Sequence, residues 1–247
     1  ASVKEVLEWA EKQNFFSFQL QNIIQKQNSL KQNYQITEIK ELQNENLKDY
    51  LHQRGLSQVV YPLIKEVQFK IGDKNFYAVG FENLSGGWEL RNPFYKGSLL
   101  KKDISAIKLN NESHNQNETE KRIVVFEGFI DALSFVEMKP FFNGNLLVMN
   151  SISLLNRTKE YLQNYSEIHL FLDNDKPGEI CKNEILKSFP EAKDHSEIYA
   201  IHKDLNDYFV FRNNTKIEKQ QRIELNPKQE QEEIETNQAH PNYKRKR

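Results

Sequence analysis

The second half of this chain alternates apolar runs with segments of helical periodicity, and this alternation limits the possible folds more than any other feature. Four apolar runs are each followed by an amphipathic segment. The runs lie at residues 122–127, 145–149, 167–172 and 196–201, and the helical segments lie at 130–138, 156–164, 178–188 and 204–210. A run such as Ile123 to Phe126 has no polar alternation, which is typical of a strand covered on both faces. We therefore predict an α/β fold in which a parallel sheet is flanked by helices.

Acidic side chains follow two of these predicted strands. Glu127 ends the first run and is followed by Gly128, which allows a sharp turn into the next element. Asp173 and Asp175 follow the third run. Because they lie two residues apart, an extended backbone directs both carboxylates to one side and Asn174 to the other. Strand ends of this kind are where open α/β sheets bind ligands.

The three acids predict a site for a divalent cation. Carboxylates about 4 Å apart repel by roughly 1 to 4 kcal/mol per pair, so Glu127, Asp173 and Asp175 together would raise a pKa or recruit a cation. Oxygen ligands suit Mg²⁺ or Mn²⁺. The alternative interpretation is that each acid only caps a helix and that Asp173 to Gly178 is an ordinary turn. The occurrence of both segments after apolar strands favours the metal site.

Composition restricts the remaining function classes. The 247 residues carry 34 Lys and Arg against 35 Asp and Glu, so a nucleic-acid surface has to be a local patch. The single cysteine, Cys181, excludes an internal disulfide framework and a Cys-based zinc site in this sequence, and we expect it to be buried. No apolar stretch approaches a membrane span, and the amino end has the pattern of an amphipathic helix instead of a signal peptide. We predict a soluble cytoplasmic protein with no membrane partner.

The sequence divides into four predicted regions. They are an N-terminal helix and connector (1–36), a small α+β subdomain (37–118), the α/β domain (119–212) and a mobile charged tail (213–247). In the second region we expect one or two helices from Thr37 to Gly55 and a short helix after Ser57. Alternating runs then predict an antiparallel meander at residues 67–71, 76–81 and 88–91.

Two segments resemble the motifs of Toprim domains, the metal-binding fold of bacterial-type DNA primases, topoisomerases and some nucleases. They are Phe126-Glu127-Gly128 and Asp173-Asn174-Asp175, in the expected order and at the expected strand ends. Over residues 37–210 the chain more closely resembles the Toprim-containing primase-like proteins of bacterial mobile elements. The resemblance implies a Toprim sheet preceded by a small basic subdomain, with Mg²⁺ or Mn²⁺ as cofactor. Fuller relatives carry an amino-terminal zinc finger, which this sequence lacks, so the resemblance leaves open whether this piece primes alone.

The resemblance also implies contacts with phosphates. The segment Tyr50–Leu56 is similar to the helix ending in Arg-Gly that opens the primase catalytic core, and Arg91–Gly97 is similar to its basic subdomain. Lys203–Asp207 is similar to the acidic segment that closes many Toprim domains, which makes Asp204 a further candidate metal ligand, with helix capping as the alternative. Surface solubility is the alternative for the lysines. The candidate nucleic-acid and nucleotide contacts are Arg54, Arg91, Lys96, Lys101, Lys102 and Lys203.

For function, the resemblance implies metal-dependent nucleotidyl transfer on single-stranded DNA, that is, primase-like synthesis of RNA primers from ribonucleoside triphosphates in DNA replication or mobile-element transfer. Glu127, Asp173 and Asp175 are then the catalytic residues, and a replicative helicase or a relaxase is a candidate partner. Two alternatives stay open. One is a Toprim phosphodiesterase or nuclease, in which the same carboxylates activate water, and the other is a non-catalytic module that binds single-stranded DNA during mobilisation.

Overall fold

The structure is a computed structural model that describes residues 34–109 and 121–225. The chain divides into two compact units. Of the described residues, the first unit holds 34–39 and 67–77, and the second holds 40–66, 78–109 and 121–225. The N-terminal helix predicted near residue 3 and the polar loop at 110–120 lie outside the described residues.

The first unit is built on strands. It contains most of β1 (Tyr34–Lys40) and β2 (Lys65–Ile71) and the first residues of β3 (Lys74–Glu82). Gly72, at φ 58°, makes the turn between β2 and β3, and the rings of Phe69 and Phe76 stack with centroids 5.6 Å apart. The prediction that a helix begins at Thr37 is wrong, because this residue lies in β1. The β-branched side chains of Ile36, Thr37 and Ile39 favour the extended backbone there.

The second unit opens with helix α3 (Glu45–Gln53), which the sequence predicted. Asn44 caps it by accepting a hydrogen bond from the Leu47 amide, and Gly55 ends the turn that follows at φ 74°. A 3₁₀ helix, η1 (Gln58–Leu63), then follows Ser57 as expected.

Strands β4 (Trp88–Asn92) and β5 (Tyr95–Leu99) form an antiparallel hairpin in the second unit. The hydrogen-bonded order of the first sheet is β1-β2-β3-β4-β5. The predicted meander is therefore present. Strand β5 was missed because Lys96, Gly97 and Ser98 break the apolar alternation that marks a strand.

The second sheet has the order β10-β9-β7-β8-β6. Strands β7 (Arg122–Phe126), β8 (Gly144–Val148) and β9 (Glu167–Phe171) are parallel, as predicted. Strand β6 (Ser105–Leu109) pairs antiparallel with β8, so the sheet is mixed and begins before residue 119. An antiparallel edge strand is common on an otherwise parallel sheet.

The strand predicted at residues 196–201 is wrong. The short strand β10 (Lys193–Asp194) precedes it, and 3₁₀ helix η3 (Ser196–Tyr199) takes its place. The Asp194 carboxylate accepts hydrogen bonds from the backbone amide and the hydroxyl of Ser196, at 3.0 and 2.8 Å, which turns the chain out of the sheet. The apolar residues of this segment contribute to the core and do not form a strand: the Tyr199 side chain is buried.

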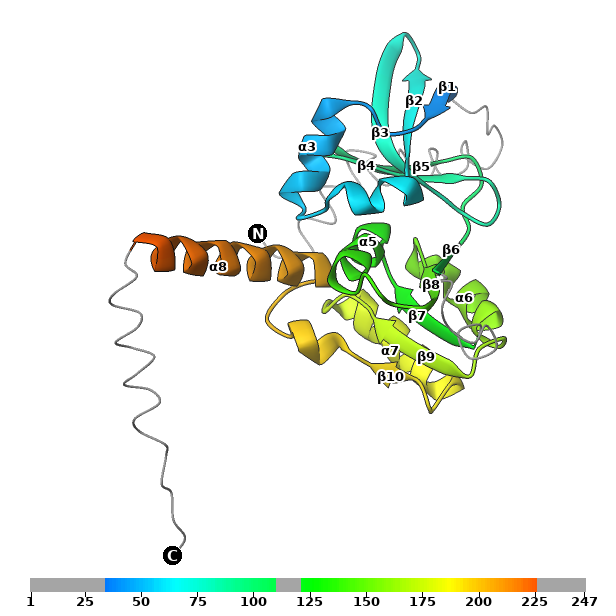
Figure 1. The fold of residues 1–247 in the computed structure, drawn as a ribbon. Coiled ribbons are helices and arrows are strands. Elements are labelled where there is room, and N and C mark those ends of the chain that lie inside the picture. The colour runs from blue at the N-terminus through cyan, green and yellow to red at the C-terminus, as the bar shows by residue number, and fades with distance from the viewer. Residues whose placement is uncertain (1–33, 110–120, 226–247) are drawn as a thin grey trace, which may run out of the picture. The chain divides into compact units, whose positions relative to one another are not determined.

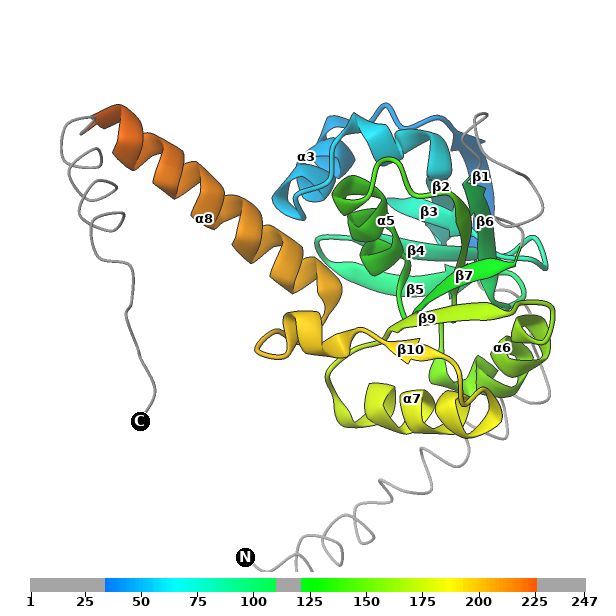
Figure 2. The same ribbon diagram turned by 60° about the horizontal axis from the view of Figure 1, so that its bottom comes forward.

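Helices cover both faces of this sheet (Figures 1 and 2). Val124 and Phe126 pack in one core with α5 (Phe129–Met138). Ile123 and Val125 pack in another core with α6 (Leu155–Leu162) and α7 (Lys176–Ser188). This division explains the apolar run without polar alternation, as predicted. Cys181 of α7 is buried in the second core, also as predicted.

Helix α8 (Leu205–Leu225) is much longer than the predicted helix at 204–210. Residues 213–225, which composition assigned to a mobile tail, are helical, and residues 226–247 lie outside the described part. Glu, Lys, Gln and Arg have high helix propensity, so the polar composition that suggested disorder also supports a helix. Among the described helices, none has the length and apolar content needed to cross a membrane.

Candidate active site

The ends of β7 and β8 are joined by backbone hydrogen bonds that place Glu127. The Met149 amide donates to the Phe126 carbonyl at 2.8 Å, and the Asn150 amide donates to the Glu127 carbonyl at 3.0 Å. Asn150 has a φ of 62° and donates its side-chain amide to the Asp103 carbonyl. Glu127 is therefore held at the carboxyl end of its strand, as the sequence predicted.

Asn174 separates the two aspartates and anchors the loop before α8. Its backbone amide donates to the Lys203 carbonyl at 2.7 Å. Its side-chain amide donates to the carbonyls of Tyr199 and His202, at 2.9 and 3.1 Å. Asn174 thus points away from the carboxylates of Asp173 and Asp175, in agreement with the prediction from their spacing.

Lys203 is brought against both aspartates by this anchored loop. Its ammonium lies 3.9 Å from Asp173 Oδ2 and 3.8 Å from Asp175 Oδ2. The Lys203 side chain is 61% exposed, so it is free to move away from these carboxylates. A cation between two carboxylates is the arrangement expected where their repulsion has to be neutralised.

Asp175 has a second role as the N-cap of α7. Its Oδ1 accepts a hydrogen bond from the Gly178 amide at 3.0 Å, so the helix-cap interpretation is correct for this residue. Gly178 is required by packing, because a Cβ there would lie 2.2 Å from the Asp173 carbonyl oxygen. The close approach of α7 to the backbone of Asp173 fixes both aspartates.

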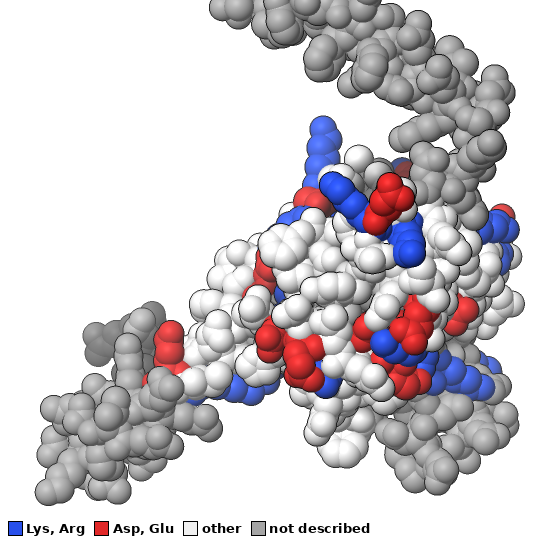
Figure 3. Space-filling model, turned by 90° about the horizontal axis from the view of Figure 1, so that it is seen from above, with Lys and Arg blue, Asp and Glu red and all other residues white. Residues whose placement is uncertain are grey.

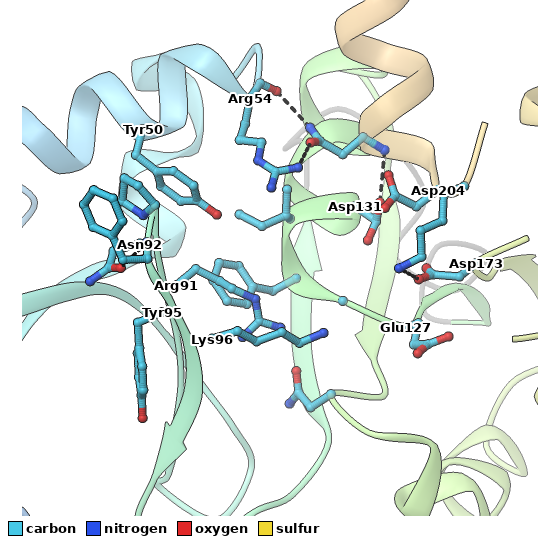
Figure 4. Close-up of a pocket in the computed structure, with 18 residues that line it drawn as sticks. Tyr50, Arg54, Arg91, Asn92, Tyr95, Lys96, Glu127, Asp131, Asp173 and Asp204 are labelled. Atoms are coloured by element: carbon cyan, nitrogen blue, oxygen red, sulfur yellow. Dashed lines mark hydrogen bonds and ion pairs between the residues drawn. The ribbon is translucent and has the colours of Figure 1, made fainter. Parts of the chain in front are cut away.

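Glu127 and Asp173 line a cavity of about 400 Å³, within the range of small-molecule sites. Figure 4 shows carboxylates on one side of it and cationic and aromatic side chains on the other. The carboxylates are Glu127, Asp131, Asp173 and Asp204, and the facing side chains include Tyr50, Arg54, Arg91, Phe94, Tyr95 and Lys96. We call these the acidic wall and the basic wall.

The basic wall contains three of the predicted phosphate contacts. The Arg54 guanidinium donates to Asn206 Oδ1 at 3.1 Å, and that of Arg91 lies over the Phe129 ring, 5.3 Å from its centroid. Burial lowers the pKa of Arg91. Burial and then Asp175 raise the pKa of Glu127, and the nearby Lys96 ammonium opposes this rise.

The other predicted contacts are placed differently. Lys203 also lines the cavity, beside the acidic wall, whereas Lys101 and Lys102 are exposed and do not line it. Asp175 does not line the cavity either. On the face of the molecule shown in Figure 3, acidic and basic side chains are intermingled, in keeping with the near-zero net charge.

Asp131 and Asn206 are site residues that the sequence analysis missed. Asp131 lies in the first turn of α5, is 8% exposed, and accepts a hydrogen bond from the Asn206 amide at 3.0 Å. Asp204, which was predicted, accepts from the Asp207 amide at 2.8 Å and so also has the cap role considered for it. The available signal for Asp131 was an acidic residue in the first turn of the helix that follows Glu127.

The acidic wall concentrates negative charge in a partly desolvated space. Burial, reinforced by Glu127 and Asp204, raises the pKa of Asp173 to about 7, although Lys203 opposes this rise. Burial and then Asp175 raise the pKa of Glu127. Burial, followed by Asp204 and Asp173, raises the pKa of Asp131 well above its ordinary value. Perturbed carboxyl groups that share a cleft are typical of functional sites.

The chemistry of this wall fits a hard divalent cation. The donors are carboxylate oxygens, and Glu127 Oε2 is buried without a hydrogen-bond partner among the described residues. Within residues 34–109 and 121–225, no three His, Cys, Asp or Glu side chains are gathered closely enough to hold a metal ion. A centre formed by Glu127, Asp173 and Asp175 therefore stays a prediction.

Comparison with known proteins identifies two segments. The model of a Toprim-like family matches residues 124–209, and that of a domain of unknown function, DUF8464, matches residues 36–100. A search of curated proteins found no match.

Solved structures of bacteriophage T7 proteins are similar to this chain. The crystal structure of the primase fragment of the T7 primase-helicase protein is 17% identical, with a TM-score of 0.49 over 75% of this chain and 81% of that one. The second is T7 lagging-strand DNA polymerase interacting with primase domains of two gp4 subunits bound to an RNA/DNA hybrid and dTTP. It is 17% identical, with a TM-score of 0.47 over 73% of this chain and 96% of that one.

The family match covers the strand ends that carry Glu127 and Asp173, and it covers Asp204 before α8. It also covers the parallel strands and the helices on both faces of the sheet. The predicted Toprim domain agrees with this match, and residues 124–209 form a Toprim-like domain.

Proposed function

We propose that this protein catalyses metal-dependent nucleotidyl transfer on single-stranded DNA, making RNA primers from ribonucleoside triphosphates. The observation that carries the proposal is the cavity whose acidic and basic walls face each other. Carboxylates on one side suit a divalent cation, and guanidinium and ammonium groups on the other suit phosphates. The Toprim-like family match supports the same assignment.

In this proposal, Glu127, Asp173 and Asp175 hold Mg²⁺ or Mn²⁺, and Asp204 stands beside them. The bound ion supplies neutralisation of the triphosphate and of the charge that develops at the α-phosphate. The Lys203 ammonium lies 3.9 and 3.8 Å from Asp173 and Asp175, so it would compete with an ion that these carboxylates would hold. Alternatively, Glu127 accepts the proton of an attacking hydroxyl, and in support of this its Oε2 is buried and has no hydrogen-bond partner among the described residues.

The basic wall orients the substrates. Arg91 is held over Phe129 and also donates to its neighbour's carbonyl at Leu90, which restricts the direction of its guanidinium. Arg54 is held by Asn206. Preorganised cations of this kind bind phosphates with little loss of side-chain entropy, which favours catalysis through positioning.

The test is a template-dependent ribonucleotide incorporation assay on single-stranded DNA with Mg²⁺ or Mn²⁺. The native chain is compared with Glu127→Gln and Asp173→Asn, and Glu179→Gln serves as the matched control, because Glu179 is an exposed acid in the first turn of α7 outside the cavity. We expect both cavity variants to lose at least about 100-fold in rate, the scale of a lost electrostatic or acid/base contribution. Incorporation unchanged in both would refute the proposal.

Two other outcomes of these experiments would indicate a different function. Cleavage of labelled DNA without incorporation would replace the proposal with a phosphodiesterase, since the same acidic wall suits activation of water. DNA binding that survives EDTA and both substitutions, without turnover, would identify a non-catalytic binding module. We further propose DNA replication or mobile-element transfer as the context, with a replicative helicase or a relaxase as partner, which co-purification with the native chain would test.

A further inference from the structure

Phe94 is the most exposed large apolar side chain of the described residues, with 97% of its surface open to solvent. It lies in the turn between β4 and β5 and lines the cavity. A fully exposed phenyl ring has no packing role in the fold, because it buries almost no area. Its placement at the cavity therefore calls for a ligand with an apolar face.

The turn that presents this ring is well defined. The Asn92 side chain accepts a hydrogen bond from the Phe94 amide at 2.9 Å, and Asn92 pairs with Tyr95 at the end of the hairpin. Pro93 restricts the backbone before Phe94. The Tyr95 ring lies along its own strand, since a Cβ on Gly97 would meet the Tyr95 hydroxyl at 2.1 Å. Phe94 is thus the aromatic ring of this turn that points into solvent.

Exposure alone does not identify a binding site, and a second phenylalanine shows this. Phe141 is 89% exposed but lies in the loop between α5 and β8, away from the residues that line the cavity. Phe94 differs because Lys96, two residues away, and Arg54 line the same cavity. An exposed ring beside cations is the combination with which proteins bind single-stranded nucleic acid, the cations contacting phosphates and the ring stacking on a base.

We propose that Phe94 stacks on an unpaired base of single-stranded DNA that enters the cavity. This inference rests on the proposed function, because it takes the DNA template as the ligand. Stacking on a phenyl ring requires no hydrogen bonds to base edges and is therefore tolerant of sequence. Phe94 is a binding residue for the template, and Lys96 and Arg54 neutralise the adjacent phosphates.

The test measures the affinity of the full chain for a fluorescein-labelled single-stranded oligonucleotide by anisotropy, without nucleotides. Phe94→Ala is expected to weaken binding by about 5- to 150-fold, the range reported for loss of one stacked base. Phe94→Trp should preserve or strengthen binding, and Phe94→Leu, which keeps apolar bulk without an aromatic face, should weaken it nearly as much as alanine. Phe141→Ala is the matched control and should bind as the native chain does.

A second measurement reports the contact directly. In Phe94→Trp, stacking on a base should quench the fluorescence of the new tryptophan when the oligonucleotide is added, whereas Phe141→Trp should show no added quenching. Equal affinities of the native chain, Phe94→Ala and Phe94→Leu, with no added quenching, would overturn the stacking and leave the proposed function intact. Native chain that binds no single-stranded DNA would overturn both proposals together.

Discussion

Arg54 and Asn206 exchange two hydrogen bonds although they are 152 residues apart in the sequence. The Arg54 guanidinium donates to Asn206 Oδ1 at 3.1 Å, and Asn206 Nδ2 donates to the Arg54 carbonyl at 2.8 Å. Asn206 Nδ2 also donates to Ser134 Oγ at 2.9 Å. One buried amide therefore connects the end of α3, the first turns of α8 and the middle of α5. The Asn206 amide also orients the Arg54 guanidinium, which belongs to the basic wall.

Asn206→Ala should destabilise the protein and weaken phosphate binding. The substitution removes a side chain that is 1% exposed and leaves the Arg54 carbonyl without this donor. We expect the free energy of unfolding to fall by about 2 kcal/mol, measured by chemical denaturation. Asn164→Ala is the control, because Asn164 donates to Tyr161 at an exposed position, and its change should stay within about 0.5 kcal/mol. Equal effects of the two substitutions would contradict the role given to Asn206.

The pKa of Asp173 predicts how stability depends on pH in the absence of divalent ions. Its value of about 7 in the folded protein lies above the ordinary 3.8. Between these values the folded state binds more protons than the unfolded state, so stability falls as pH rises from about 4 to 7. Asp173→Asn should abolish this part of the fall, which amounts to at most about 4 kcal/mol, and raise the melting temperature at pH 8.

Asp194 provides a control with the opposite sign. Burial raises its pKa, but hydrogen bonds from Ser196 and Lys182 outweigh burial and lower it overall. Asp194→Asn should therefore leave the fall between pH 4 and 7 in place. Adding Mn²⁺ should stabilise the native chain more at pH 8 than at pH 5, because ion binding requires ionised carboxylates. A melting temperature that is independent of pH in native chain and Asp173→Asn alike would contradict this assignment.

Gly178→Ala should disturb the acidic wall through the backbone. The added Cβ would lie 2.2 Å from the Asp173 carbonyl oxygen, so α7 or the Asp173 backbone has to shift. We expect a loss of about 1 to 3 kcal/mol in unfolding free energy, together with weaker Mn²⁺ binding by calorimetry. Gly86→Ala, where a Cβ meets nothing within 4 Å but φ is 74°, should lower stability by about 1 kcal/mol and leave Mn²⁺ binding unchanged.

Lys203→Met should strengthen divalent-ion binding. The ammonium that lies 3.9 and 3.8 Å from Asp173 and Asp175 competes with an ion for the same oxygens. Removing it should raise the Mn²⁺ affinity by up to about fivefold in calorimetry, the scale of an exposed ion pair. Lys101→Met, an exposed lysine outside the cavity, should change nothing. Weaker Mn²⁺ binding in Lys203→Met would show that Lys203 supports the ion instead of competing with it.

Local sequence was sufficient for the three central parallel strands of the second sheet, β7, β8 and β9, and for the acids that follow β7 and β9. The apolar run from Ile123 to Phe126 has to be covered on both faces, and parallel strands bring their carboxyl ends to one edge, so Glu127 and Asp173 are placed by pattern alone. Local pattern failed at β5 and β10, where short polar strands are held by their neighbours in the sheet. It also failed at α8, where the composition suited both helix and disorder.

What the sequence by itself determined is the alternation of strands and helices from β7 to α7, the Toprim motifs, and the positions of Glu127 and Asp173 at the ends of their strands. Only the tertiary structure decided which cations face them. Arg54, Arg91 and Lys96 line the cavity while Lys101 and Lys102 do not, and Asn206 meets Arg54 across 152 residues of chain. The physical reason is the distance along the sequence over which each kind of interaction acts. Hydrophobic periodicity acts between residues near in sequence, whereas the partners of a charged or buried polar side chain depend on which distant segments the core brings together.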